Sequence, residues 1–197
     1  MKHHNSTRIG VIFSSIVLGL GVNINLSNAQ PDLPTPGTAC QVTIQSVTSF
    51  QPAKRKDGSV IPADFVVTSN VLGTPQNSDL QGPINYLSLG FGGELVVKFP
   101  GAVANGSGND IRIVETSFGN PSCANYKERI RVAVSQDGTT YSVIGEGCLD
   151  TDFDIGVSNL GWAQYVKITD ISLRSDFPAA DADGFDVDGV ICLNGSA

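Results

Sequence analysis

The stretch RIRVAVSQDGTTYSVIGE, residues 129–146, decides the fold class of this chain. In Arg129–Ser135, charged or small residues alternate with Ile and Val, which is the period of a β-strand with one buried face. Asp137-Gly138 separates this run from a second alternating run, Thr140–Glu146. Asp-Gly between two such runs is a strong hairpin signal. The stretch therefore predicts two antiparallel strands joined by a tight turn.

Further short runs of the same kind occur along the rest of the chain, and no helical stripe of useful length interrupts them. Turn residues, many of them glycine, separate the runs. Seven or more short strands of this kind predict an all-β fold, an antiparallel β-sandwich of the jelly-roll type. The other predicted strands are Cys40–Val47, Glu94–Phe99, Asp110–Glu115, Gln164–Ile171 and Phe185–Leu193.

The first 29 residues have the pattern of an export signal. Lys2 and Arg8 give a basic start, Ile9–Leu20 is apolar but short for a membrane span, and Ser27–Ala29 offers small residues for cleavage. About 168 residues then remain, enough for one domain with a sizeable core. The predicted organisation is a signal peptide (1–29), a Pro-rich lead (30–39) and a single β-sandwich domain (40–197).

Charge and histidine content limit the possible functions. Without Lys2 and Arg8 the formal net charge changes from −7 to about −9, which argues against nucleic acid or an anionic membrane as a partner. The only histidines, His3 and His4, lie in the signal, so a Ser-His-Asp triad and a His-ligated metal are excluded. We expect a secreted protein, extracellular or at the cell surface, with the periplasm as an alternative and no membrane span after cleavage. The one basic cluster, Lys54–Gly58, is expected to be a solvated turn.

Four cysteines in an exported chain predict two disulfide bonds. Cys123 and Cys148 flank the predicted hairpin, and Cys40 and Cys192 lie near the two ends of the domain. We therefore expect the pairs Cys123–Cys148 and Cys40–Cys192, although three pairings are possible. The spacings do not match a zinc site.

Acidic residues crowd the last 48 residues, and this pattern predicts a bound Ca²⁺. Asp181, Asp183, Asp186 and Asp188 fall within eight residues. Carboxylates this close repel one another unless they are solvated, paired or bound to a hard cation. The spacing does not fit an EF-hand, so we expect a site in which Asp183, Asp186 and Asp188 combine with groups distant in sequence. A solvated acidic strand edge is the alternative.

A second acidic pair completes the predicted metal site. Asp110 begins the strand Asp110–Glu115, and Glu115 has the same parity as the apolar Ile111 and Ile113. A regular strand would place Glu115 inward, where it needs a partner. That partner is the metal ion, backbone amides, or an arginine such as Arg129 or Arg131.

Several motifs resemble those of a known family. Ser69–Gln76 (SNVLGTPQ) and Tyr86–Phe99 (YLSLGFGGELVVKF) are similar to the loop and strand that open discoidin-like, galactose-binding-like domains. Asn109–Glu115, Arg131–Gly138 and Asp183–Val190 follow in the order found in secreted bacterial cell-surface proteins of this fold. The resemblance covers about Cys40 to Leu193 and implies an eight-stranded jelly roll with a structural Ca²⁺. It also implies that Leu72–Gln76 lies close to the ion.

The resemblance supplies no catalytic residue. We therefore expect a non-catalytic binding or adhesion module stabilised by Ca²⁺, whose partner is a carbohydrate or another cell-surface component. A secreted hydrolase that uses only Asp and Glu is one alternative. A structural subunit of a surface layer or fibre is another, and the sequence does not predict the oligomeric state.

Overall fold

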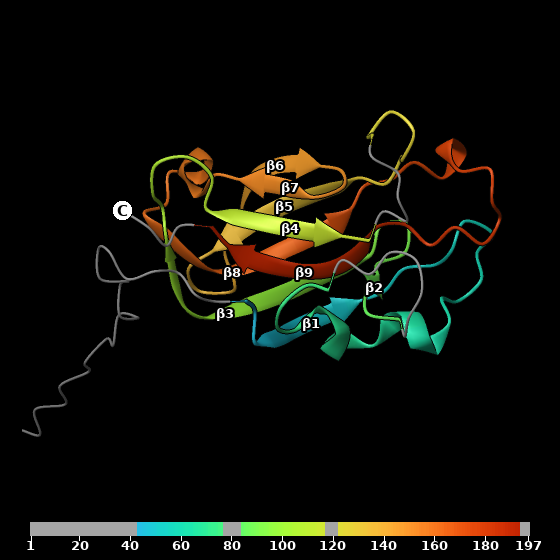
Figure 1. Cartoon of the computed structure of the whole chain (residues 1–197), viewed down its shortest axis with the longest axis horizontal. Coiled ribbons are helices and arrows are strands. Elements are labelled where there is room, and N and C mark those ends of the chain that lie inside the picture. Colours follow the sequence, from blue (N-terminus) through green and yellow to red (C-terminus); the bar gives the residue numbers. More distant parts are fainter. Residues whose placement is uncertain (1–42, 77–83, 117–121, 194–197) are drawn as a thin grey trace, which may run out of the picture.

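The computed structural model describes residues 43–76, 84–116 and 122–193, which form two packed antiparallel sheets (Figure 1). The predicted signal and Pro-rich lead lie outside these residues. The larger sheet contains, in spatial order, β1 (Ser46–Gln51), β3 (Glu94–Ala104), β8 (Trp162–Asp170), β5 (Ile130–Ser135) and β6 (Ser142–Gly147). The smaller sheet contains β2 (Leu87–Ser88), β9 (Asp186–Cys192), β4 (Ile111–Glu115) and β7 (Thr151–Phe153).

The predicted all-β sandwich is confirmed, with nine strands in the described residues where the resemblance implied eight. The helices of this part are four short 3₁₀ turns: η1 (Ala63–Val66), η2 (Thr68–Val71), η3 (Ile155–Ser158) and η4 (Arg174–Asp176). None of the described helices has the length and hydrophobicity that crossing a bilayer requires.

The apolar residues of the alternating runs form the core between the two sheets. On β3, Leu95, Val97 and Phe99 are all at most 1% exposed, as the period of two predicts. The predicted hairpin also forms, since β5 pairs with β6 across the Asp137-Gly138 turn. Ser135, Thr139 and Thr140 contact the Asp137 carboxylate in that turn. Local residues therefore specify the turn, while β5 also pairs with β8 and packs into the core.

The first predicted strand is wrong in its limits. Its first three residues, 40–42, lie outside the described residues; from Thr43 on, only an isolated bridge to Ile191 precedes β1, which begins at Ser46. Ile44 is fully buried, so its apolar character reflects packing against the core and not membership of a strand. The sequence did not separate these two causes because both place an apolar residue inside.

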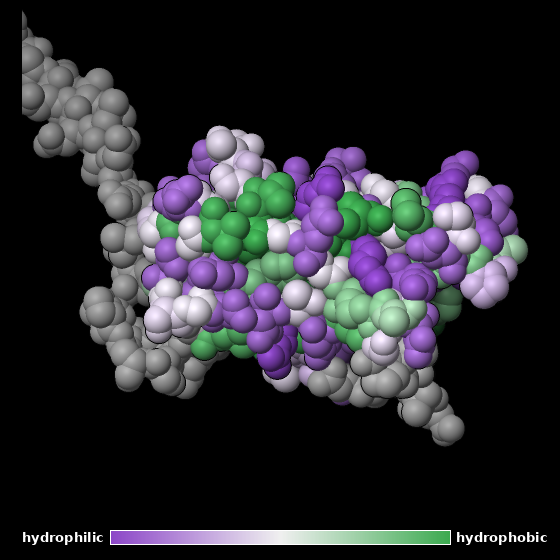
Figure 2. All heavy atoms as spheres, turned by 90° about the horizontal axis from the view of Figure 1, so that it is seen from above, coloured by the Kyte–Doolittle hydropathy of each residue, from purple (hydrophilic) through white to green (hydrophobic). Residues whose placement is uncertain are grey.

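The connections divide the sandwich into two unlike ends. The β1–β2, β2–β3, β4–β5, β6–β7 and β8–β9 connections lie at one end, which we call the loop end, on the right in Figure 1. The opposite end carries the β3–β4, β5–β6 and β7–β8 connections and the end of β9, and it lacks the long β1–β2, β4–β5 and β8–β9 connections of the loop end. In a view from above, hydrophilic residues predominate over the right-hand, loop end (Figure 2).

Candidate functional site

A small hairpin dominates the outer part of the loop end. Lys54 and Val60 form its bridge, and Gly58 takes a φ of +86° at its tip. The backbone amides of Lys56 and Asp57 donate to Ala182 and Ala180 in the β8–β9 connection. The predicted turn is thus confirmed, but it is docked on a second loop and only partly solvated.

Aromatic rings and guanidinium groups surround this hairpin. Arg55 forms an ion pair with Asp183 at 3.4 Å and lies 5.8 Å from the centre of the Phe65 ring. The Phe65 ring in turn stacks on Tyr86, with 5.7 Å between ring centres. Phe91 packs edge-on against Phe177, and Arg174 lies over the Phe91 ring. The loops at this end are therefore held together by ring and cation contacts.

Below this outer layer lies a buried acidic cluster, which we define as Glu115, Glu128, Asp170 and Asp186. All four are at most 7% exposed. Glu115 ends β4, Glu128 precedes β5, Asp170 ends β8 and Asp186 begins β9, so both sheets contribute. The Asp186 carboxylate accepts a hydrogen bond from the Ser88 hydroxyl at 2.5 Å.

Burial and mutual repulsion change the titration of this cluster. Burial is the main cause of a strongly raised pKa for Glu128, and the charges of Asp186 and Glu115 raise it further. The pKa of Asp186 is likewise raised well above its ordinary value by burial and then by the charge of Asp183. Oε2 of Glu128 has no hydrogen-bond partner among the described residues. Burial and mutual repulsion therefore disfavour the charged forms of Glu128 and Asp186.

Asp170 differs from the other members of the cluster because its oxygens are well satisfied. They accept from the amides of Gly92, Ser172 and Phe185 and from the Ser172 hydroxyl, at 2.7–3.2 Å. Burial still raises its pKa, although these bonds act in the opposite direction. Asp170 thereby connects the β2–β3 turn, the end of β8 and the start of β9. Its role is structural.

The structure places three of the five predicted metal ligands, Asp183, Asp186 and Glu115, at the loop end. Asp183, Asp186 and Glu115 lie close enough at the loop end for Asp183 and Glu115 to raise the pKa of Asp186. Asp188, 2% exposed, instead accepts from the Gln76 amide at 3.0 Å, while the next residue, Gly189, contacts Pro75. The loop Leu72–Gln76 therefore packs on β9 beside Asp188. Because Asp186 and Asp188 are buried, the alternative of a solvated acidic edge is wrong for both.

The fifth residue, Asp110, lies at the opposite end of the sandwich. Its carboxylate accepts from the amides of Gly106 and Ile155 at 2.8 and 2.7 Å, and its carbonyl accepts from Leu193. It holds the β3–β4 and β7–β8 connections together, far along β4 from Glu115. Across the residues that the structure describes, no three His, Cys, Asp or Glu side chains converge as a ready-made metal site.

The alternative of an arginine partner for Glu115 is wrong. Arg131 pairs with Glu146 at 2.7 Å, and the Arg129 guanidinium donates to the carbonyls of Cys123, Tyr126 and Glu128. Glu115 is buried within the cluster, after a register shift between it and Val114.

Sequence reasoning missed Glu128 and Asp170, although the signal was present. Glu128 has the parity of the buried Ile130 and Val132, and Asp170 has the parity of the buried Val166 and Ile168. Extending each apolar alternation by one step would have placed both carboxylates inside the sandwich. Both carboxylates stand apart from the dense acidic runs of the sequence.

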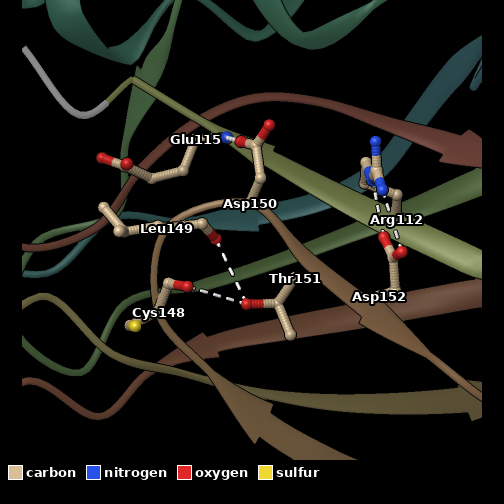
Figure 3. A network of polar contacts seen from close by, with 7 residues as sticks. All are labelled: Arg112, Glu115, Cys148, Leu149, Asp150, Thr151 and Asp152. Atoms are coloured by element: carbon tan, nitrogen blue, oxygen red, sulfur yellow. Dashed lines mark hydrogen bonds and ion pairs between the residues drawn. The ribbon is translucent and has the colours of Figure 1, made fainter. Parts of the chain in front are cut away.

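A disulfide bond fixes one side of the loop end. The predicted Cys123–Cys148 bond is confirmed, with 5.9 Å between the Cα atoms, and joins the β4–β5 loop to the β6–β7 turn. Cys192 is also disulfide-bonded, while its predicted partner, Cys40, lies outside the described residues. Two residues after Cys148, Asp150 accepts from the Glu115 amide at 3.0 Å, and Arg112 pairs with Asp152 (Figure 3). The β6–β7 turn thus also supports the strand that carries Glu115.

Comparison with models of known protein families found no match, and comparison with curated proteins found none. Among solved structures, the family 32 carbohydrate-binding module of Streptococcus pneumoniae EndoD is similar, with 10% sequence identity and a TM-score of 0.50. The match covers 77% of this chain and 99% of that module. The chain therefore shares the jelly-roll β-sandwich fold of that module.

The resemblance to discoidin-like jelly rolls is thereby confirmed for the fold. The C-terminal domain of a chitobiase from Bacteroides fragilis also matches, with 13% identity and a TM-score of 0.44 over 75% of this chain and 91% of that domain.

Proposed function

We propose that this protein is a secreted, non-catalytic carbohydrate-binding module whose ligand site lies at the loop end. The observation that carries the proposal is the match between the described sandwich and almost the whole EndoD module. Secretion is supported by the signal-like residues 1–29. Because a fold does not fix a ligand, the site itself must supply the remaining support.

The loop end suits carbohydrate recognition because it combines rings with charged groups on supported loops. Phe65, Phe91 and Phe177 lie there beside Arg55 and Arg174. Binding sites commonly pair apolar or aromatic walls with a few placed polar groups. Binding residues also tend to lie on loops that a rigid scaffold positions.

The burial of the acidic cluster supports a non-catalytic role. Glycoside hydrolysis by two carboxylates requires that both reach the scissile bond. Glu115, Glu128 and Asp186 are 3%, 7% and 4% exposed, so a sugar at the surface does not reach them. The raised pKa values of Glu128 and Asp186 arise from burial inside the fold and not from a substrate cleft.

A glycan array run on the protein from residue 30 onward, with calcium and with chelator, tests the proposal. We expect selective binding to a subset of glycans and no release of reducing sugar from the glycans that bind. Arg174→Gln, on the outer loop, should weaken binding, while Arg112→Gln, on β4 and paired with Asp152, should not. Cleavage of a bound glycan would favour the hydrolase, and calcium-dependent self-association without glycan binding would favour the structural subunit.

We further propose that a calcium ion stabilises the loop end. Glu115, Glu128 and Asp186 from the acidic cluster, with Asp183 beside them, are the residues best placed to hold it. Support comes from their burial and mutual repulsion, which a hard cation with oxygen ligands would relieve. Asp110 is not included because it lies at the other end. Elemental analysis of protein dialysed from calcium buffer should find about one ion per chain.

A further inference from the structure

An apolar pocket opens beside the Lys54–Val60 hairpin. It has a volume of about 210 Å³ and is lined by Pro52, Ala53, Lys54, Val60, Ile61 and Val66. Val60 is 80% exposed, whereas Ile61 is 3% exposed. The pocket is smaller than the roughly 300–1,000 Å³ that encloses a drug-sized ligand, so it admits a substituent or one edge of a ring.

The walls of this pocket are fixed by backbone contacts. The amide of Ala53 donates to Leu89 at 2.8 Å, and Phe91 donates to the Lys54 carbonyl at 3.1 Å. Gly90 approaches Ala53 so closely that a Cβ there would lie 2.6 Å from its carbonyl. Because these backbone contacts already fix the pocket, a ligand does not have to order its walls on binding. The entropic cost of binding is therefore lower.

Lys54 is the one charged residue among those that line the pocket. It is exposed, and among the ion pairs of the described residues none involves its ammonium group. The neighbouring Arg55 and Lys56 are already engaged, with Asp183 and with the carbonyl of Phe177. Lys54 is therefore available to an anionic group that sits over the pocket.

We propose, on the basis of the proposed function, that this pocket selects an acylated acidic sugar. The acyl group enters between Val60, Ile61 and Val66, where burial of its methyl group is favourable. Lys54 then pairs with a carboxylate on the same sugar unit. The apolar wall and the single cation at its edge match these two groups of the ligand.

An array that carries each glycan in three forms tests this inference: acylated and acidic, deacylated and acidic, and acylated with the carboxylate reduced to an alcohol. The wild type should bind the first form at least about tenfold more tightly than either of the others. Equal binding of the acylated and deacylated forms would overturn the inference. Absence of binding to any glycan would overturn the proposed function as well.

Matched variants separate the two contacts. Val60→Ser should weaken binding of the acylated acidic form about three- to tenfold and leave the deacylated form unchanged. Lys54→Gln should remove the preference for the acidic over the reduced form. Val157→Ser, 61% exposed on η3, and Lys98→Gln on β3 serve as controls and should change neither preference. If the protein binds glycans and neither Val60→Ser nor Lys54→Gln changes that binding, this inference is overturned. The proposed function would then still stand.

Discussion

Buried carboxylates inside the sandwich determine how the stability of the loop end depends on pH. Glu128 and Asp186 are buried near one another, and each has a raised pKa because burial disfavours the charged form. A carboxyl group with a raised pKa in the folded state stabilises the fold below its unfolded pKa. That stability is lost as pH rises toward the folded pKa.

Glu128→Gln should therefore flatten the pH dependence of stability. In chelator, the wild type should lose free energy of unfolding as pH rises above about 4.5, the ordinary value for Glu. The loss is about 1.4 kcal/mol per pH unit and group until the folded pKa is reached. Urea unfolding between pH 4 and 9 measures it.

The matched control for this change is Glu146→Gln. Glu146 is about half exposed and pairs with Arg131 at the surface, so its removal should leave the wild-type slope in place. Parallel pH profiles for Glu128→Gln and the wild type would contradict the assignment of the slope to the acidic cluster.

Asp170→Asn should destabilise the protein by about 2–4 kcal/mol, because the amide cannot accept all four hydrogen bonds that the carboxylate accepts. The loss arises at Gly92, Ser172 and Phe185, which Asp170 connects. Chemical denaturation at neutral pH measures the change. Asp176→Asn, on the exposed η4 turn, should cost less than about 0.5 kcal/mol. A similar small effect at both positions would show that Asp170 is not a structural centre.

At the scale of elements, the loops at the loop end are stabilised by cross-links and not by regular pairing. The Cys123–Cys148 bond joins the β4–β5 loop to the β6–β7 turn, which are not paired with each other as β-strands in the described residues. Asp150 connects the β6–β7 turn to β4 by accepting a hydrogen bond from the Glu115 amide. Hydrogen bonds from the Arg129 side chain to the Cys123, Tyr126 and Glu128 carbonyls hold the β4–β5 loop over the acidic cluster.

Replacing both Cys123 and Cys148 with serine should lower the free energy of unfolding by about 3 kcal/mol, since the bond closes a loop of 25 residues. Without the disulfide, the β4–β5 connection that carries Glu128 is no longer held to the β6–β7 turn. The rate of amide hydrogen exchange should therefore increase more at residues 122–129 than in β3 or β8. Replacing the surface pair with Arg112→Gln and Asp152→Asn provides a comparison and should cost about 1 kcal/mol or less. Uniform exchange changes across the sandwich would contradict a local role for the disulfide.

At the scale of the whole molecule, the two ends of the sandwich have different roles. The opposite end is tied by short connections and by Asp110, whereas the loop end carries the acidic cluster, the aromatic rings and the apolar pocket. A calcium ion at the loop end would connect both sheets, because both sheets contribute residues to the acidic cluster. Its effect would then appear as a change in global stability.

The melting temperature should be several degrees higher in millimolar calcium than in chelator, since binding at a hundredfold excess over Kd adds about 2.7 kcal/mol. Magnesium should help less because it requires small octahedral sites. Asp186→Asn should reduce the calcium-dependent shift, and Asp110→Asn should lower stability without changing that shift. Scanning calorimetry distinguishes these cases. If the shift vanished in Asp110→Asn and persisted in Asp186→Asn, the ion would belong at the opposite end.

The sequence by itself determined the fold class and the hairpin at Asp137-Gly138, and it predicted the Cys123–Cys148 bond as one of three possible pairings. These features depend on side chains that are close in sequence, or on a strand period that repeats locally. The inward position of Glu115 could also be predicted, because it follows from the parity of Ile111 and Ile113.

Only the tertiary structure decided which acids meet. Asp110 precedes β4 and Glu115 ends it, so they lie at opposite ends of the sandwich, while Glu128 and Asp170 approach Asp186 from the side of the other sheet. The pairing of sheets sets these distances, and no local pattern encodes them. The pocket at Val60 also depends on tertiary contacts, because Val66 of η1 completes its lining and backbone hydrogen bonds with Leu89 and Phe91 hold Ala53 and Lys54 in place.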